Sequence, residues 1–265
     1  GGGAVSTCTL TFDTNGGSAI DKITKDSGTT IDLTAYKPTR AGYTFAGWFS
    51  DKALTKAVTS VKLTANTTVY AKWTQNGGTA QNPFVDVKEG AYYYDAVLWA
   101  VEQKITSGTS ATTFHPDQAM NRAMLVTVLY RMEKEPTAEG DGKRFADVPA
   151  GAYYAKAVAW ASDKGIVAGY SETQFGPGDT ITREQLAVIL NRYATYKGYN
   201  TSKTADLATF QDADQISEWA RVPVQWANAM KLLNGRTSTT LAPKGSATRA
   251  EVAKILVTFL DTVKR

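Results

Sequence analysis

The sequence has one cysteine, Cys8, and one histidine, His115, among its 265 residues. One cysteine cannot form an internal disulfide, and one imidazole leaves no second histidine for a metal site or a catalytic relay. His115 lies in the turn-like stretch TFHPDQ, without a Gly-x-Ser-x-Gly or cysteine-protease context, so we expect an exposed loop histidine. The composition therefore predicts no metal, no other cofactor and no catalytic residue.

Long apolar runs are also missing. None approaches the roughly 18 residues that a membrane helix needs, so we expect no membrane insertion. The net charge of +4 is not concentrated, since residues 1–82 carry 8 Lys+Arg against 5 Asp+Glu and residues 83–265 carry 21 against 20. Neither part is a basic field of the kind that nucleic acid requires. An anionic partner would have to be held locally.

The chain begins with GGGAVSTC, which is typical of a linker rather than of a signal peptide. We expect residues 1–7 to be a linker remnant and the chain to be a fragment of a longer protein. Residues 8–74 then alternate Thr, Val, Tyr and Trp around an NGG turn and predict short strands. Residues 75–82 are polar and predict a flexible linker. From Phe84 onward the apolar period becomes helical.

The helical part repeats three times, over residues 83–140, 141–204 and 205–265, called repeats 1, 2 and 3 below. Each repeat contains an F-x-D motif, a tryptophan, a glycine and an arginine in the same order. Tryptophan and arginine are 23 residues apart in every copy, at Trp99 and Arg122, Trp160 and Arg183, and Trp226 and Arg249. Glycine and arginine are 14 apart, with glycines at Gly108, Gly169 and Gly235. Equal internal spacing indicates one supersecondary unit used three times.

Each repeat predicts a helix, a long loop and a second helix. Two amphipathic helices cannot close a core alone, so we expect the repeats to pack together. Thr182 with Gln185, and Thr248 with Glu251, predict capping boxes at the second helices. The arginine then occupies the first helical position, where its charge opposes the helix dipole. We expect it to need an anion, either a neighbouring carboxylate or a ligand.

The order F-x-D-V, WA, G-I-V-x-G, F-x-P, I-T-R-E over residues 83–265 resembles three S-layer homology domains. That resemblance implies a pseudo-threefold helical bundle whose grooves between repeats bind an acidic secondary cell-wall polysaccharide, commonly one with pyruvylated N-acetylmannosamine. It implies a location in the bacterial cell wall or S-layer, with possible S-layer neighbours as partners. The family's ligand residues correspond to these positions: Arg122, Arg183, Arg249, Trp99, Trp160, Trp226, Gly108, Gly169, Gly235, Asp86, Asp147 and Asp212.

Each of these residue types also has a structural interpretation, and the residues alone leave both open. The tryptophans can be core residues, the aspartates helix caps or arginine partners, and the arginines inter-repeat salt bridges. The glycines can be positive-φ turns. If Arg183 binds ligand together with free amides at a helix end or a glycine turn, Arg183→Gln should weaken binding and leave stability nearly unchanged or improved.

The copies also differ from one another. Repeat 1 has Asn121 and Met124 in place of the capping threonine and acid, and repeat 3 places Pro223 where its first helix is expected. A helix-interior proline predicts a kink or a lost hydrogen bond. We therefore do not expect the three grooves to be equivalent.

Residues 8–73 carry LTFDTNGGS, PTRAGYTFAGWFSD and VYAKW, which resemble a Listeria-Bacteroides repeat of the internalin B-repeat type. This implies a small β-grasp-like stalk domain, and the whole chain is predicted to be multi-domain α+β. The leading interpretation is a non-catalytic wall anchor carrying a cargo N-terminal to it. The alternative is an adhesion or S-layer assembly module whose β domain binds a protein partner.

Overall fold

The computed structural model describes residues 6–40, 42–75, 82–138 and 144–263. The chain forms two compact units, one built of strands and one of helices, so the fold is mixed α+β. The expected linker remnant at residues 1–7 and the expected linker at 75–82 lie largely outside the described residues. Of their described ends, Gln75 is the last residue of a strand, and the Asn82 side chain accepts a hydrogen bond from Phe84 N.

The N-terminal unit is a five-stranded sheet in the order β2-β1-β7-β4-β5, with a separate pair β3-β6. Its strands are β1 Thr7–Asp13, β2 Ile23–Asp26, β3 Thr30–Asp32, β4 Tyr43–Phe49, β5 Ala57–Val58, β6 Ser60–Lys62 and β7 Thr67–Gln75. The central strands β1 and β7 run parallel, and the other neighbours are antiparallel. Cys8, Leu10 and Phe12 alternate inward from β1 into one core with Trp48 and Val69. The period-two pattern thus predicted the buried face of the sheet.

The NGG turn follows β1. Asn15 and Gly16 both have positive φ, which these residue types adopt at low cost. Gly17 is required for a different reason, because a Cβ there would overlap the ring of Trp73. The indole N–H of Trp73 donates to the Thr14 carbonyl at 2.8 Å and fixes the turn against β7.

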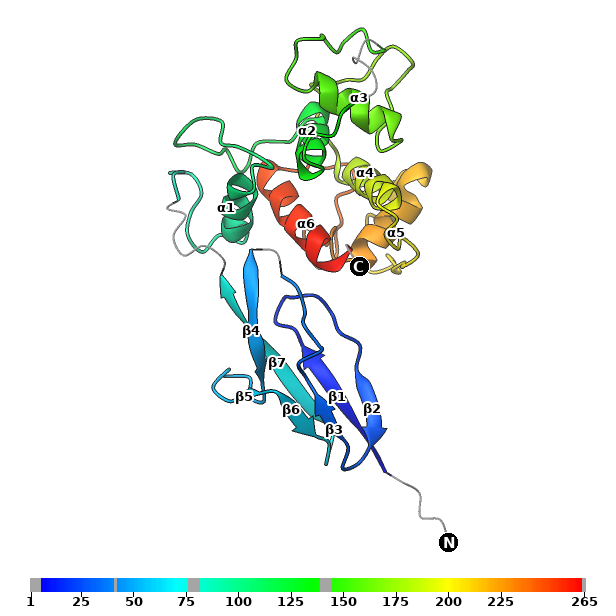
Figure 1. The fold of residues 1–265 in the computed structure, drawn as a ribbon. Helices are drawn as coiled ribbons and strands as arrows, with labels where there is room; N and C mark the ends of the chain where they lie inside the picture. Colours follow the sequence, from blue (N-terminus) through cyan, green and yellow to red (C-terminus); the bar gives the residue numbers. More distant parts are fainter. Residues whose placement is uncertain (1–5, 41, 76–81, 139–143, 264–265) are drawn as a thin grey trace. The chain divides into compact units, whose positions relative to one another are not determined.

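The second unit contains six α-helices and two short 3-10 turns in its described residues. Their bounds are α1 Tyr94–Glu102, α2 Arg122–Met132, α3 Ala155–Asp163, α4 Arg183–Tyr196, η1 Ala213–Gln215, η2 Glu218–Ala220, α5 Arg221–Ala229 and α6 Arg249–Thr262. Figure 1 shows α2, α4 and α6 on the inside, with α1, α3 and α5 around them. Both predicted capping boxes are present, and Asn121 caps α2 by accepting from Met124 N. The arginines are the first helical residues, as predicted.

Each second helix packs on the first helix of the next repeat. Helix α2 contacts α3 and α4 contacts α5, while Ala253 of α6 joins the core cluster of Val97 on α1. The repeats therefore pack on one another, as expected.

Three backbone hydrogen bonds join the repeats just before the second helices. Met120 N donates to Ala247 O at 2.8 Å, Ile181 N to Met120 O at 2.8 Å, and Ala247 N to Ile181 O at 3.0 Å. These three residues are buried, so the bonds are shielded from water. The ring they form places the starts of α2, α4 and α6 around one centre.

The expected disruption at Pro223 does not occur. Helix α5 begins at Arg221, so Pro223 is its third residue. The first four N–H groups of a helix have no partner within the helix, and a proline there removes no helical hydrogen bond. Helix α5 consequently matches α1 and α3, which also begin five residues before their tryptophans. Among the described residues, no helix is long and apolar enough to cross a membrane.

Candidate ligand site at the inter-repeat arginines

Arg122, Arg183 and Arg249 are 5%, 4% and 7% exposed, and each reaches into the loop of the next repeat. Their Nε atoms donate to one loop carbonyl each, in the pairs Arg122 to Phe175 O at 3.0 Å, Arg183 to Leu241 O at 2.9 Å and Arg249 to Phe114 O at 3.0 Å. Their Nη2 atoms donate to the carbonyls of Ala168, Asn234 and Ser107, which directly precede the three motif glycines. We call each such contact an arginine junction and name it by its arginine.

The aspartates of the F-x-D motifs hold the same loops from the other side. Each accepts two backbone N–H bonds, in the sets Asp86 from Phe114 and His115, Asp147 from Phe175 and Gly176, and Asp212 from Leu241 and Ala242, all at 2.7–2.9 Å. The pKa of Asp212 lies below its ordinary value chiefly because Leu241 N–H stabilises the carboxylate. For Asp86 and Asp147, desolvation opposes the shift, but the backbone bonds outweigh it and the pKa is again lowered. The aspartates are thus loop clamps rather than helix caps.

The first amides of the second helices are occupied by the chain itself. Arg183 N donates to Gly245 O at 2.9 Å and Glu184 N to Pro243 O at 2.9 Å. The corresponding amides of α2 and α6 also donate to loop carbonyls of the next repeat. Helix-end amides are therefore not free to share a ligand's charge, because the inter-repeat loop takes these donors, and the alternative with glycine-turn amides stays a prediction.

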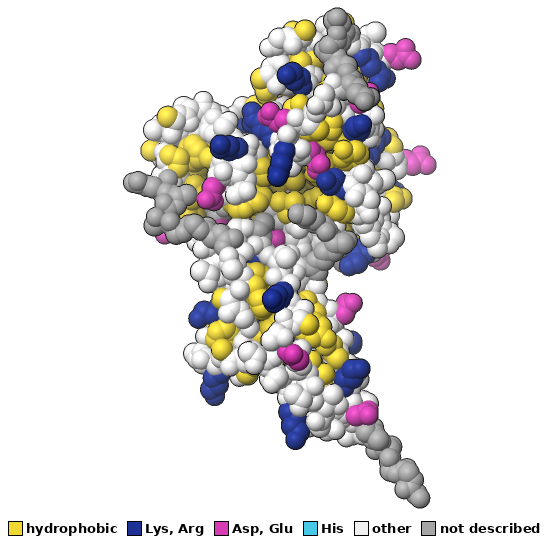
Figure 2. All heavy atoms as spheres, viewed as in Figure 1, with side chains coloured by type: hydrophobic (Ala, Val, Ile, Leu, Met, Phe, Trp, Pro, Cys, Tyr) yellow, Lys and Arg dark blue, Asp and Glu magenta, His cyan; other side chains and the backbone are white. Residues whose placement is uncertain are grey.

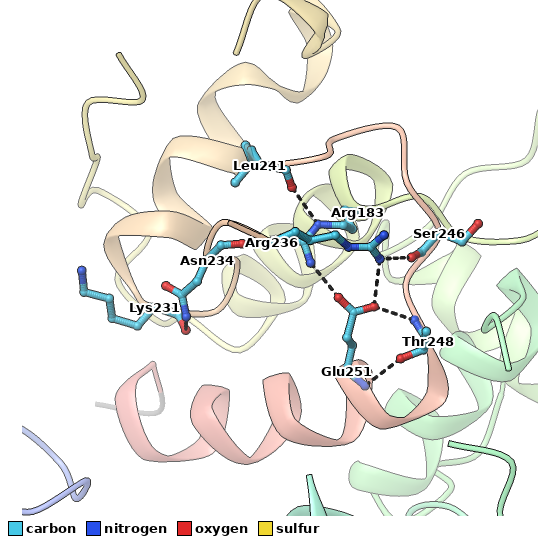
Figure 3. Close-up of polar contacts among 8 residues, drawn as sticks. All are labelled: Arg183, Lys231, Asn234, Arg236, Leu241, Ser246, Thr248 and Glu251. Atoms are coloured by element: carbon cyan, nitrogen blue, oxygen red, sulfur yellow. Dashed lines mark hydrogen bonds and ion pairs between the residues drawn. The ribbon is translucent and has the colours of Figure 1, made fainter. Parts of the chain in front are cut away.

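The Arg183 junction contains a protein carboxylate (Figure 3). Arg183 Nη1 donates to Glu251 Oε1 at 2.8 Å, and Arg236 Nη2 lies 3.2 Å from Glu251 Oε2. Burial lowers the pKa of Arg183, and the charge of Glu251 opposes that shift. The inter-repeat salt bridge, one of the two interpretations that the sequence left open, is thus present at this copy. Removal of Arg183 should therefore reduce stability, whereas the ligand-binding hypothesis expected stability to stay nearly unchanged.

The other two junctions hold their guanidinium groups without a carboxylate partner among the described residues. Arg122 contacts two rings, with its Cζ 4.6 Å from the centroids of both Tyr170 and Phe175. Arg249 has one ring contact, with its Cζ 4.4 Å from Phe114. Backbone carbonyls and ring faces hold these two guanidinium groups, and a ligand anion there stays a prediction.

The motif tryptophans lie mainly in the core. Trp160 and Trp226 are fully buried, whereas Trp99 is partly buried. A ligand role for these residues stays a prediction, but the burial of two of them favours packing. Exposed aromatics occur instead seven residues earlier in each repeat, at Tyr92, Tyr153 and Trp219, each more than half exposed. Sequence reasoning missed this trio, although its fixed spacing from the tryptophan is visible in the repeats.

The motif glycines do not have positive φ, so that interpretation is wrong. A Cβ on Gly108 would lie 2.5 Å from the Phe84 ring and 2.5 Å from Ser110 O. Gly169 and Gly235 face the equivalent phenylalanines, Phe145 and Phe210, and equivalent loop carbonyls. These glycines are needed because the phenylalanine of each F-x-D motif packs directly on the loop backbone.

Surface charge on the face drawn in Figure 2, and the possible metal ligands among the described residues, indicate no second candidate site. Lys/Arg and Asp/Glu side chains are interspersed on the face drawn in Figure 2, without a field of one sign. Within the described part of the chain, no group of three His, Cys, Asp or Glu residues could hold a metal ion. His115 is an exposed loop residue, as predicted, and its Nδ1 lies 2.5 Å from Thr109 Oγ1.

The architecture is that of a β domain followed by interlocked helical repeats, and comparison with known proteins names both parts. Residues 9–72 match the Listeria-Bacteroides repeat domain, and residues 83–123, 144–187 and 209–253 match the S-layer homology domain. The chain therefore belongs to the S-layer homology family and consists of a Listeria-Bacteroides repeat domain followed by three S-layer homology domains.

The curated relatives match this chain over a small part of their own length. An endoglucanase of Bacillus sp. (strain KSM-635) is 33% identical over 67% of the chain and 19% of its own length. An amylopullulanase of Thermoanaerobacterium thermosulfurigenes is 30% identical over 85% of the chain and 12% of its length. The surface-layer 125 kDa protein of Lysinibacillus sphaericus is 30% identical over 66% of the chain and 15% of its length. The chain thus spans less than a fifth of these relatives. Its domains place it at the bacterial cell surface, as a surface-anchoring module.

Proposed function

We propose that this chain anchors a longer surface protein non-covalently to an acidic secondary cell-wall polysaccharide, one that carries pyruvylated N-acetylmannosamine. The observation that carries the proposal is the set of buried arginines at the inter-repeat junctions. A guanidinium held by backbone carbonyls keeps its positive charge, and a ligand carboxylate can bind it through charge-assisted hydrogen bonds. The binding grooves lie between neighbouring repeats.

The exposed aromatics supply the second element of a saccharide site. Tyr153 is 65% exposed, and its pKa is raised by desolvation while the charges of Arg131 and Arg249 oppose that shift. Tyr92 is 63% exposed, and its pKa is raised by desolvation and by the charge of Glu251. An exposed flat ring together with a cation suits a sugar that has both an apolar face and a carboxylate.

The repeats act as one binding unit in this proposal. The cyclic packing of α2 on α3, α4 on α5 and α6 on α1 supports a pseudo-threefold bundle. The N-terminal unit is a β-grasp-like stalk between this bundle and a cargo. The chain performs no catalysis, and the enzyme activities named for its relatives belong to the larger remainder of those proteins.

Binding to isolated bacterial walls tests the proposal. The whole chain should sediment with walls that retain the secondary polymer, and not with the same walls after its chemical removal. Undiminished binding to stripped walls would contradict the proposal. Retention of binding through the N-terminal unit alone would favour the adhesion alternative.

A further inference from the structure

The three arginine junctions have different residues at two equivalent positions. The first position is that of Glu251, the third residue of its helix, which contacts Arg183. By the equivalence of the repeats, the corresponding third residues are Gln185 for the Arg122 junction and Met124 for the Arg249 junction. The second position follows the motif glycine and is Tyr170, Arg236 and Thr109 in the Arg122, Arg183 and Arg249 junctions, respectively. These differences decide what covers each guanidinium.

In the Arg183 junction the chain supplies its own anion. Glu251 accepts from Arg183 at 2.8 Å, from Arg236 at 3.2 Å and from Thr248 N at 2.9 Å, so both carboxylate oxygens are occupied. A second carboxylate, Glu184, is buried next to Arg183 in the sequence and accepts from Lys244 Nζ at 2.6 Å. A ligand carboxylate would have to displace Glu251 and leave it without its partners.

In the Arg122 junction an aromatic ring takes the outer position. The guanidinium contacts the ring of Tyr170 as well as that of Phe175. A Cβ on Gly176 would meet both the Tyr170 ring and Asp179 Oδ2, so Tyr170 lies beside an acidic side chain. Two aromatic rings therefore cover the Arg122 guanidinium.

The Arg249 junction has neither cover. Its two equivalent positions are the apolar Met124 and the small Thr109, whose hydroxyl contacts Thr113 and His115. Arg249 is more than nine-tenths buried, and Nε and Nη2 are bonded to carbonyls, but Nη1 has no partner among the described residues. Nη1 of Arg122 likewise has no partner among the described residues, but the Tyr170 ring contacts that guanidinium. Among the described residues, Phe114 is the only ring in contact with the Arg249 guanidinium.

We propose that the junction between repeats 3 and 1, formed by Arg249, Thr109 and Met124, is the principal carboxylate site, and that Glu251 closes the junction between repeats 2 and 3. This inference rests on the proposed function and specifies which of its sites is used. Repeats 2 and 3 match the family pattern best, so the motifs alone would favour the junction between those two repeats. The proposal instead favours the junction between repeats 3 and 1. The glutamate that completes the motif in α6 is the group that blocks Arg183.

An exchange of the helix-start residue tests this assignment. Met124→Glu places a carboxylate in the Arg249 junction at the position of Glu251, and together with Asn121 it completes a capping box, so the helix is not weakened. Met124→Gln is the matched control, since it has the same length without the charge and copies Gln185. Conversely, Glu251→Gln keeps the capping geometry seen in α4 and removes the blocking charge.

Each variant of the full chain is titrated by calorimetry with a disaccharide that contains pyruvylated N-acetylmannosamine. We expect Met124→Glu to bind about tenfold to hundredfold more weakly than the uncharged Met124→Gln, and Glu251→Gln to gain a further binding equivalent. Equal binding by Met124→Glu and Met124→Gln would overturn the assignment. If wild type itself fails to bind the disaccharide while every variant remains folded, the proposed function fails instead.

Discussion

Asp86 and Arg249 are connected through a single peptide group, the one that joins Phe114 to His115. The N–H of His115 donates to Asp86 Oδ2 at 2.8 Å, and the carbonyl of Phe114 accepts from Arg249 Nε at 3.0 Å. Opposite charges at the two ends polarise the peptide in one direction, which strengthens both bonds. The aspartate and the loop belong to repeat 1 and the arginine to repeat 3, so one charge pair fixes both the loop and the assembly. The same unit recurs between Asp147 and Arg122 and between Asp212 and Arg183.

The lowered aspartate pKa values predict acid sensitivity. A carboxyl whose folded pKa is lowered contributes stability above its unfolded pKa, and this contribution is lost as the pH falls through the folded pKa. For Asp212, whose pKa lies below its ordinary 3.8, the loss should begin below about pH 5. We expect Asp212→Asn to cost about 1–2 kcal/mol of unfolding free energy at pH 7, because one of the two loop amides loses its acceptor. Urea unfolding should show this difference shrinking at pH 3, and a difference independent of pH would refute the assignment.

The motif glycines predict a steric effect. Gly108→Ala should destabilise the helical unit by about 1–3 kcal/mol, because its Cβ would overlap Phe84 and the Ser110 carbonyl. Gly151→Ala is the matched control, since a Cβ there meets nothing within 4 Å and its φ is not positive. Thermal unfolding of both variants measures the difference. Equal melting temperatures would show that the Phe84 contact does not require glycine.

The Arg183 contacts predict a stability order. Arg183→Gln leaves Leu241 O without its buried donor and removes one partner of Glu251, at a cost of about 3 kcal/mol. Thr182→Ala removes only the cap and should cost about 0.5–2 kcal/mol. Denaturant unfolding should therefore rank Arg183→Gln as the weaker protein. The reverse order would mean that the arginine is not a structural link between repeats 2 and 3.

The local parts of this site follow from sequence, and the non-local parts do not. The Thr182 to Gln185 spacing predicts a capping box and so places Arg183 at a helix start, because both depend on neighbours within one turn. The acceptors of Arg183 are backbone carbonyls of repeat 3, and backbone carbonyls have no sequence signature. Glu251 was predicted as a capping acid, but its second role depends on packing between repeats. The prediction of a positive φ at the motif glycines was wrong, because glycine is required both where φ is positive and where a side chain packs closely on the backbone, and the sequence does not distinguish the two.

The two separate cores predict that binding is modular. Leu10, Phe12 and Trp48 belong to the core of the N-terminal unit, whereas Phe84 and Val97 belong to a core of the helical unit. Residues 84–265 produced alone should therefore sediment with walls as well as the whole chain does. A fragment that is folded by circular dichroism but does not bind would show that the β domain takes part in binding.

The most direct measurement for the anchoring account is a titration of the whole chain with two disaccharides that differ only in the pyruvyl group on N-acetylmannosamine. The carboxylate of that group is the proposed partner of the inter-repeat arginines, and its loss should cost about tenfold to hundredfold in affinity. We predict saturable binding of the pyruvylated form and weak or undetectable binding of the other. Equal affinity for the two sugars would contradict a carboxylate-directed anchor.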